Sequence, residues 1–121
     1  MASDIALKIY IPEKLLVDKS VYRIVLPCDG KTLTVIKDRA PTLLALDMGT
    51  IRILNEADET VEEIFVSGGA VDIKENTCTI LTEGSYNKND MSLDRAKALN
   101  EEFPNFFHEW LIKVFEKETK K

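Results

Sequence analysis

Few residues of this chain belong to the types that carry out acid–base, nucleophilic or metal chemistry. The only histidine is His108, and one imidazole supports neither a Ser-His-Asp triad nor a histidine-based zinc site without distant partners. We expect His108 to lie on the surface of a helix. The two cysteines, Cys28 and Cys78, have no Cys-x-x-Cys or Cys/His spacing, which predicts reduced, partly buried thiols. No catalytic residue, metal ligand or cofactor is expected.

Two further stretches contain groups that catalytic sites use. Carboxylates crowd residues 56–63, but neither the spacing of a calcium loop nor an apolar pocket accompanies them, so a solvated hairpin tip is expected. Ser67-Gly68-Gly69 joins two strand-like runs and lacks the helix N-terminus that would hold a phosphate. We therefore predict a structural turn at Gly68 and Gly69, with positive φ at one of them.

The elements that position these residues are predicted to be mostly strands. β-branched or alternating apolar runs recur at residues 5–11, 15–17, 21–26, 33–36, 43–46, 50–54, 64–66, 70–73 and 77–81. Turn signals separate them, including Pro27-Cys28-Asp29-Gly30 with Asp-Gly at its tip. This pattern predicts an antiparallel sandwich or barrel, and the absence of helical stretches between the strands argues against a parallel sheet. The expected core residues are Ile9, Ile24, Leu26, Ile53, Phe65, Val71 and Ile80.

After residue 90 the hydrophobic period becomes helical. Ser92 can cap a first helix whose apolar face is Leu93, Ala96, Leu99 and Phe103, and Pro104 ends it. A second helix is expected from Phe106 to about Glu118, with an apolar stripe of Phe107, Trp110, Leu111, Val114 and Phe115. The stripe is too apolar to stay in water, so the two helices should form a compact hairpin or pack on the strands. We expect a strand domain at residues 1–86 and a helical hairpin at residues 87–121.

Composition limits the function classes. The chain has 121 residues, 45% of them hydrophobic, and a net charge of −5, which fits one soluble domain with a small appendage. An acidic chain is a poor match for nucleic acid or an anionic lipid surface. No apolar run is long enough to cross a bilayer, and the N-terminus has no signal-peptide pattern. Neither nucleic-acid binding nor membrane insertion is expected.

Three stretches, taken in order, resemble a known family. They are residues 29–44 (DGKTLTVIKDRAPTLL), residues 49–53 (GTIRI) and residues 64–73 (IFVSGGAVDI), the last followed by the strand at 77–81. Together they are similar to the epsilon subunit of the F-type ATP synthase. The resemblance implies a mainly β protein with a C-terminal α part: a ten-stranded antiparallel β-sandwich followed by a short helix–turn–helix hairpin. It also implies a non-catalytic accessory subunit of the central stalk, which couples ion flow through the membrane rotor ring to ATP synthesis by the catalytic head.

The resemblance further implies partners and contact residues. The gamma subunit of the central stalk and the ring of c subunits are the expected partners, at the cytoplasmic face of a plasma or inner membrane, with an organelle origin left open. Ring contacts are expected at Asp29, Lys31, Lys37 and Arg39, and this chain departs from the family's pattern near Thr34 and at residues 36–39 of the same stretch. Residues 93–98 (LDRAKA) are similar to the family's ATP-binding stretch, so Leu93, Asp94, Lys97 and Ala98 are candidate ATP contacts. Lys97 replaces the family's arginine and loses its planar fork.

Two other functions stay open at this stage. The hairpin is a candidate ATP-sensing module, and the whole chain could instead be an unrelated cytosolic sandwich that serves as an adaptor. The second helix is also shorter and less basic than the family's inhibitory helix, which predicts weak inhibition of ATP hydrolysis.

Overall fold

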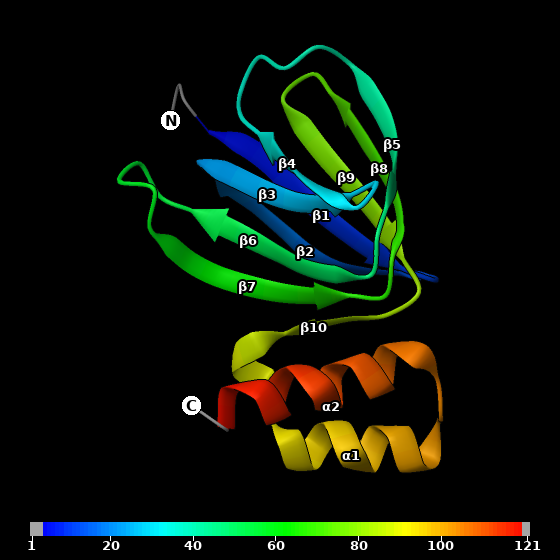
Figure 1. Ribbon diagram of the computed structural model, residues 1–121. Coiled ribbons are helices and arrows are strands. Elements are labelled where there is room, and N and C mark those ends of the chain that lie inside the picture. The colour runs from blue at the N-terminus through cyan, green and yellow to red at the C-terminus, as the bar shows by residue number, and fades with distance from the viewer. Residues whose placement is uncertain (1–3, 120–121) are drawn as a thin grey trace. The chain divides into compact units, whose positions relative to one another are not determined.

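The computed structural model describes residues 4–119, so residues 1–3 and 120–121 of the two predicted domains lie outside the description. Within these described residues, ten strands and two α-helices follow one another, and two compact units divide after Ser85 (Figure 1). The strands are β1 (Ile5–Ile11), β2 (Lys14–Val21), β3 (Arg23–Cys28), β4 (Lys31–Val35), β5 (Thr42–Leu46), β6 (Gly49–Leu54), β7 (Thr60–Val66), β8 (Gly69–Lys74), β9 (Thr77–Thr82) and β10 (Ser85–Asn87). The predicted ten-stranded sandwich with a C-terminal helical part is confirmed.

The strands form two five-stranded sheets. The first sheet has the order β2-β1-β9-β8-β5 and the second has the order β10-β7-β6-β3-β4. Most neighbours are antiparallel, as expected, but β1 and β9 run parallel, with Leu7 opposite Cys78. The expectation of a wholly antiparallel sandwich is wrong at this pair. A parallel pair needs no helical crossover here because the chain passes through the second sheet between β1 and β9.

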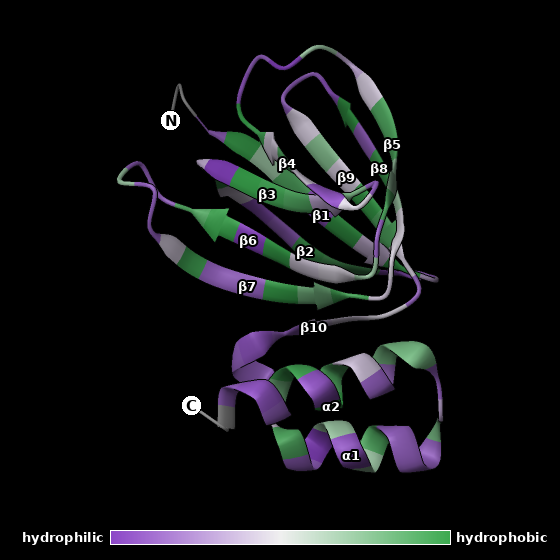
Figure 2. Cartoon of the chain, in the orientation of Figure 1, coloured by the Kyte–Doolittle hydropathy of each residue, from purple (hydrophilic) through white to green (hydrophobic). Residues whose placement is uncertain are grey.

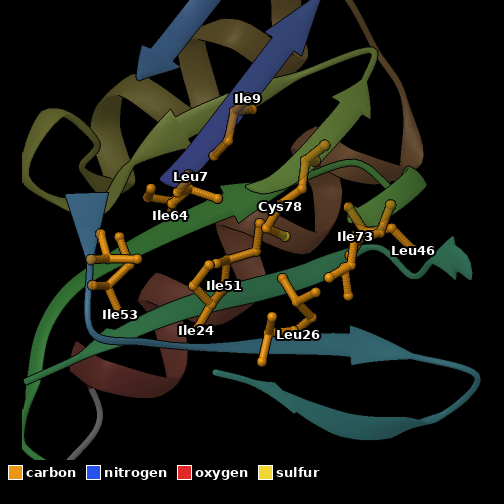
Figure 3. Close-up of a cluster of buried hydrophobic side chains, with 14 of the residues drawn as sticks. Leu7, Ile9, Ile24, Leu26, Leu46, Ile51, Ile53, Ile64, Ile73 and Cys78 are labelled. Carbon is orange, nitrogen blue, oxygen red and sulfur yellow. The ribbon is translucent and has the colours of Figure 1, made fainter. Parts of the chain in front are cut away.

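The sandwich core lies between the two sheets. Alternation places every second side chain inward, which Figure 2 shows along β6 as a hydrophilic band between hydrophobic ones. The side chains that point inward include Leu7 and Ile9 of the first sheet and Ile24, Ile51 and Ile64 of the second. Figure 3 shows these side chains converging. All seven predicted core residues are buried. Phe65, however, is only 2% exposed and lies outside this cluster, because alternation turns it to the opposite face from Ile64 and Val66.

The hairpin at the end of β3 differs from the prediction. Pro27 and Cys28 belong to the strand, opposite Thr32 and Lys31, and only Asp29 and Gly30 form the turn. Both turn residues have positive φ, at 53° and 72°, which is the geometry of a tight type I′ hairpin. Cys28 and Lys31 close the two-residue turn as a hydrogen-bonded pair, so Pro27 and Thr32 form the next, non-hydrogen-bonded pair. Proline is tolerated there because its missing N–H faces the side of β6, whose pairing with β3 covers only Arg23 to Val25.

The second unit contains α1 (Leu93–Glu102) and α2 (Phe106–Thr119), preceded by a short 3-10 turn at Lys88–Asp90. Ser92 caps α1 as predicted, since its hydroxyl accepts a hydrogen bond from the Arg95 N–H at 3.2 Å. The helices pack on each other, with Ala96 and Leu111 fully buried. Phe103 was expected on the apolar face of α1, but it follows the last turn of the helix and is 59% exposed. Within residues 4–119, no helix combines the length and apolar character that a bilayer crossing requires.

Candidate functional site

The predicted turn at Ser67-Gly68-Gly69 joins β7 to β8. Gly68 and Gly69 have φ values of 102° and 145°, a region that side-chain-bearing residues rarely adopt. The Ser67 N–H donates to the Gly84 carbonyl at 3.0 Å, and the Gly84 N–H donates to the Ser67 hydroxyl at 2.9 Å. These bonds fasten the chain after β9 to the start of β8. The turn is therefore fixed to the segment between β9 and β10.

The four candidate ring contacts fall into two pairs. Asp29 lies in the β3–β4 turn and Lys31 directly after it, and the Gly30 N–H donates to the Asp47 carboxylate at 2.7 Å. Lys37 and Arg39 lie in the loop after β4, where the Asp38 N–H donates to the Asn76 side-chain oxygen at 2.7 Å. Because β4 runs from one pair to the other, the pairs lie at opposite ends of this strand (Figure 1). The structure does not bring the four side chains into one cluster.

The four candidate ATP contacts occupy the first turns of α1. Asp94, Lys97 and Ala98 are exposed and share one side of the helix, whereas Leu93 is half-buried. The neighbouring cation, Arg95, donates to the Asp90 carbonyl and lies 5.9 Å over the Tyr86 ring. Arg95 is exposed, but it is engaged by groups just before α1, and Lys97 is the second exposed cation of this stretch.

A surface that the sequence pattern did not single out lies on the outer face of the first sheet. Strand register aligns one residue from each of its five strands into what we call the outer apolar row: Leu15, Tyr10, Leu81, Ala70 and Ala45. The next row on the same face is polar in four of its five members: Asp18, Lys8, Thr79, Asp72 and Leu43. Leu81 is 55% exposed even though it is a large apolar residue near the centre of a sheet.

A groove of about 610 Å³ follows the outer apolar row. Four of the five row residues line it, and Glu13, Lys14 and Glu83 add charge at its edge. Gly69 and Ala70 contribute only small groups to the lining, while Tyr10, Leu15 and Leu81 provide larger apolar surfaces. An apolar groove with a charged rim fits an apolar segment of another protein better than it fits a reaction. The sequence pattern alone does not identify this groove, because its lining residues come together only through the strand register.

His108 is buried, contrary to the prediction of a surface histidine. It is 6% exposed, and its Nδ1 lies 2.7 Å from the Phe103 carbonyl oxygen. A carbonyl only accepts, so Nδ1 carries the hydrogen of this bond. The backbone N–H of His108 donates to the Asn105 side-chain oxygen at 2.7 Å. The imidazole thus joins the start of α2 to the end of α1.

Both thiols are free and buried. Burial raises the pKa of Cys28, with a further contribution from the Asp47 and Asp29 carboxylates. Burial also raises the pKa of Cys78, to about 12, with smaller contributions from Cys28 and Asp72. A thiol of this kind is not a nucleophile at neutral pH.

Residues 55–59 form the β6–β7 hairpin tip, as expected, whereas Glu62 and Glu63 lie in β7 and are half-buried. The Asn55 side-chain oxygen accepts hydrogen bonds from the N–H groups of Ala57 and Glu59 and so organises the loop. Glu56, Asp58 and Glu59 are exposed, and Asp58 pairs with Arg23. Across the part of the chain that the structure describes, no three His, Cys, Asp or Glu side chains converge as a metal site would require.

Comparison with known proteins identifies relatives for most of the chain. Residues 4–88 match the family model of the ATP synthase delta/epsilon chain β-sandwich domain. The ATP synthase epsilon chain of Agrobacterium fabrum is 33% identical, over 94% of this chain and 88% of the relative. The ATP synthase epsilon chain of Nostoc punctiforme is 30% identical, over 78% of this chain and 69% of the relative.

Solved structures share the fold. A chain in the mitochondrial ATP synthase of Euglena gracilis superposes with a TM-score of 0.66 at 17% identity, covering 93% of this chain and 78% of that one. A chain in the central stalk and c-ring of the Tetrahymena thermophila mitochondrial ATP synthase superposes with a TM-score of 0.59 at 17% identity, covering 94% and 95%.

Proposed function

Since this chain belongs to the epsilon chains of the F-type ATP synthase, we propose that it works as a non-catalytic subunit of the central stalk. In this role it couples ion flow through the membrane rotor ring to ATP synthesis by the catalytic head. The mechanism is mechanical: the subunit binds the rotating shaft and the ring, and no bond is made or broken on it. It acts as a peripheral subunit on the cytoplasmic face of the energy-transducing membrane, or on the equivalent face in an organelle.

The outer apolar row and its groove carry this proposal. This exposed row crosses all five strands of the sheet. When a partner covers it, the removal of apolar surface from water contributes a favourable free energy of roughly 25 cal/mol per Å². We assign the gamma subunit to this surface. The outer face of a five-stranded sheet offers room for a stable interface, which typically buries about 1,200–2,000 Å² in total.

Stiffness is the second requirement of a torque-transmitting subunit. The space between the two sheets is filled by branched aliphatic side chains, and many of them, including Leu7, Ile24 and Ile51, have no exposed surface. Close-packed interiors deform little under load. A force applied at one end of the sandwich is therefore passed to the other end without local yielding.

The rotor ring is proposed to contact charged loops of the sandwich. Asp29 and Lys31 at one end of β4 and Lys37 and Arg39 after the other end remain the candidates. Because the two pairs lie apart, we expect one pair to face the ring directly. Charge reversal at Lys31 and, separately, at Arg39 distinguishes the two ends through the loss of ring binding.

Co-purification with gamma tests the main proposal. We expect Leu81→Asp to abolish co-elution of the folded chain with gamma, because the charge stands in the middle of the outer apolar row. Thr79→Asp is the matched control, since Thr79 lies on the same strand and face but in the polar row. If the unmodified chain fails to bind folded gamma, the proposal is wrong and the cytosolic adaptor becomes the better hypothesis.

A nucleotide-sensing role of the hairpin is the second candidate function. Its support is the shared exposed side of Asp94, Lys97 and Ala98 on α1. Titration calorimetry with ATP tests it, with Lys97→Ala as the control variant. An absence of heat at millimolar ATP removes this function and leaves the stalk proposal intact.

The hairpin is also proposed not to act as a brake on ATP hydrolysis. Leu111 of α2 has no exposed surface within the folded chain, so extending α2 into a catalytic head would first have to expose it. We expect the removal of residues 104–121 to leave the ATPase rate of the assembled catalytic head unchanged. A marked rise in that rate would contradict the proposal.

A further inference from the structure

The turn between α1 and α2 carries two exposed phenylalanines. Phe103 is 59% exposed and Phe106 is 84% exposed, and Pro104 and Asn105 between them are exposed as well. Large aromatic side chains gathered at a protrusion mark interaction sites more often than chance exposure does. We propose that this aromatic tip, residues 103–106, docks into an apolar pocket on a protein partner whose pocket rim carries Lys or Arg side chains.

The tip is held in one conformation by its own hydrogen bonds. The Phe103 N–H donates to the Leu99 carbonyl at 2.8 Å, and the Phe103 carbonyl accepts from His108 Nδ1 at 2.7 Å. The Asn105 N–H donates to the Asn100 side-chain oxygen at 3.3 Å, and the Asn105 side chain caps α2 through the His108 N–H. The backbone that carries both phenylalanines is therefore fixed by hydrogen bonds. A rigid aromatic anchor loses little conformational freedom on binding, which favours affinity.

Charge identifies the kind of partner. No Lys or Arg occurs from Ala98 to Ile112, whereas Glu101, Glu102 and Glu109 in this stretch are all exposed. His108, the remaining ionisable group of the stretch, is buried against the turn. Exposed carboxylates therefore flank the aromatic tip in the sequence. Complementary interfaces place cations opposite such negative charge.

The same charges argue against two other occupants. A second copy would bring an equally acidic tip against this one, and an anionic lipid surface would repel the carboxylates. A protein pocket with a basic rim satisfies both the aromatic and the acidic surface. This inference rests on the proposed function, which makes a neighbouring subunit of the ATP synthase the partner.

Photocrosslinking in the assembled ATP synthase tests the inference. A benzoyl-phenylalanine at position 106 replaces an exposed aromatic by a similar one, and the same probe at the exposed position 113 of α2 is the control. We expect position 106 to crosslink to one segment of another subunit with about tenfold the yield of position 113. The double variant Glu101→Lys/Glu102→Lys should lower that yield, as should raising the salt concentration.

Each other outcome counts against the inference. Crosslinks to a second copy or to lipid, or equal yields from positions 106 and 113, overturn it. A yield that does not respond to the charge reversal also overturns it, because the basic rim is then absent. Co-elution of the probe-bearing chain with gamma is measured in the same preparation, so loss of the stalk function is seen separately from loss of the tip contact.

Discussion

A β-carbon on Gly69 would lie 1.9 Å from the backbone carbonyl oxygen of Leu81. The close approach arises where the first residue of β8 pairs with the end of β9, and φ of Gly69 is 145°. We expect Gly69→Ala to cost more than about 3 kcal/mol of unfolding free energy, because a backbone conformation rare for side chains and a backbone collision add together. Urea denaturation at equilibrium measures the loss.

Gly30 supplies the control for this prediction. Its φ is also positive, at 72°, but no atom lies within 4 Å of the place a β-carbon would take. Gly30→Ala should therefore cost only the conformational term, about 1–2 kcal/mol. If the two variants unfold at the same urea concentration, the contact with Leu81 does not matter for stability.

The sandwich is expected to fold without the helices. All members of the core cluster lie between Ile5 and Ile80, and the hydrogen bonds that link Ser67 to Gly84 also lie before α1. A chain of residues 1–87, which retains β10, should stay soluble and unfold in one cooperative thermal transition. Aggregation or a broad transition would mean that the helices supply part of the core.

Leu111 should determine the stability of the helical hairpin. Leu111→Ala removes a fully buried side chain and is expected to cost about 2–5 kcal/mol, whereas Phe106→Ala removes an exposed one and should cost at most about 0.5 kcal/mol. Trp110 is the only tryptophan and stacks on Phe107 with the ring centroids 6.1 Å apart. Its emission should shift to the red in Leu111→Ala alone. Full access of a quencher to Trp110 in the unmodified chain would refute the packed hairpin.

The two thiols should resist modification in the native state. At pH 8 a thiol with a pKa of about 12 is ionised in only about one molecule in ten thousand, so Cys78 should react far more slowly with a disulfide reagent than an exposed cysteine does. Labelling in urea should be complete for both Cys28 and Cys78. Fast labelling of Cys78 without urea would mean that the sandwich opens readily.

The raised pKa of Cys78 also predicts a pH dependence. Folding favours the neutral thiol, so this contribution to stability is complete below pH 9.0 and is lost as the pH rises toward about 12. Cys78→Ala should therefore show a shallower loss of melting temperature across this alkaline range than the unmodified chain. An identical slope would show that Cys78 does not titrate within the fold.

Local pattern predicts most elements of this fold. Alternation or β-branched runs in the sequence predict nine of the ten strands. The tenth, β10, is a three-residue segment without either signal, and only the family resemblance predicts it. Pairing order is not a local property, so the parallel contact of β1 with β9 could not be predicted from alternation. In the sequence Pro27 resembles a turn residue, because its compatibility with a strand depends on where the pairing with β6 stops.

Candidate surfaces were harder to predict than elements. The loops that carry Asp29 and Arg39 were located correctly, but only the direction of β4 reveals that they lie at opposite ends of a strand. His108 looked like a surface residue because its helical position alone does not reveal that the turn before α2 brings the Phe103 carbonyl within reach. The outer apolar row draws one residue from each of five strands, so it exists only in the assembled register.

The parallel contact between β1 and β9 affects how this protein is made. Leu7 and Cys78 are aligned in neighbouring strands, so the first strand emerges from the ribosome long before its permanent neighbour does. During that interval β1 can pair only with β2, which leaves its other edge and the inner face of Ile5, Leu7 and Ile9 uncovered. Contacts so distant in sequence also slow folding, because a long loop must close before they form. The first sheet is therefore completed only after Thr82 has been synthesised, and until then the second edge of β1 is open to pairing with other chains.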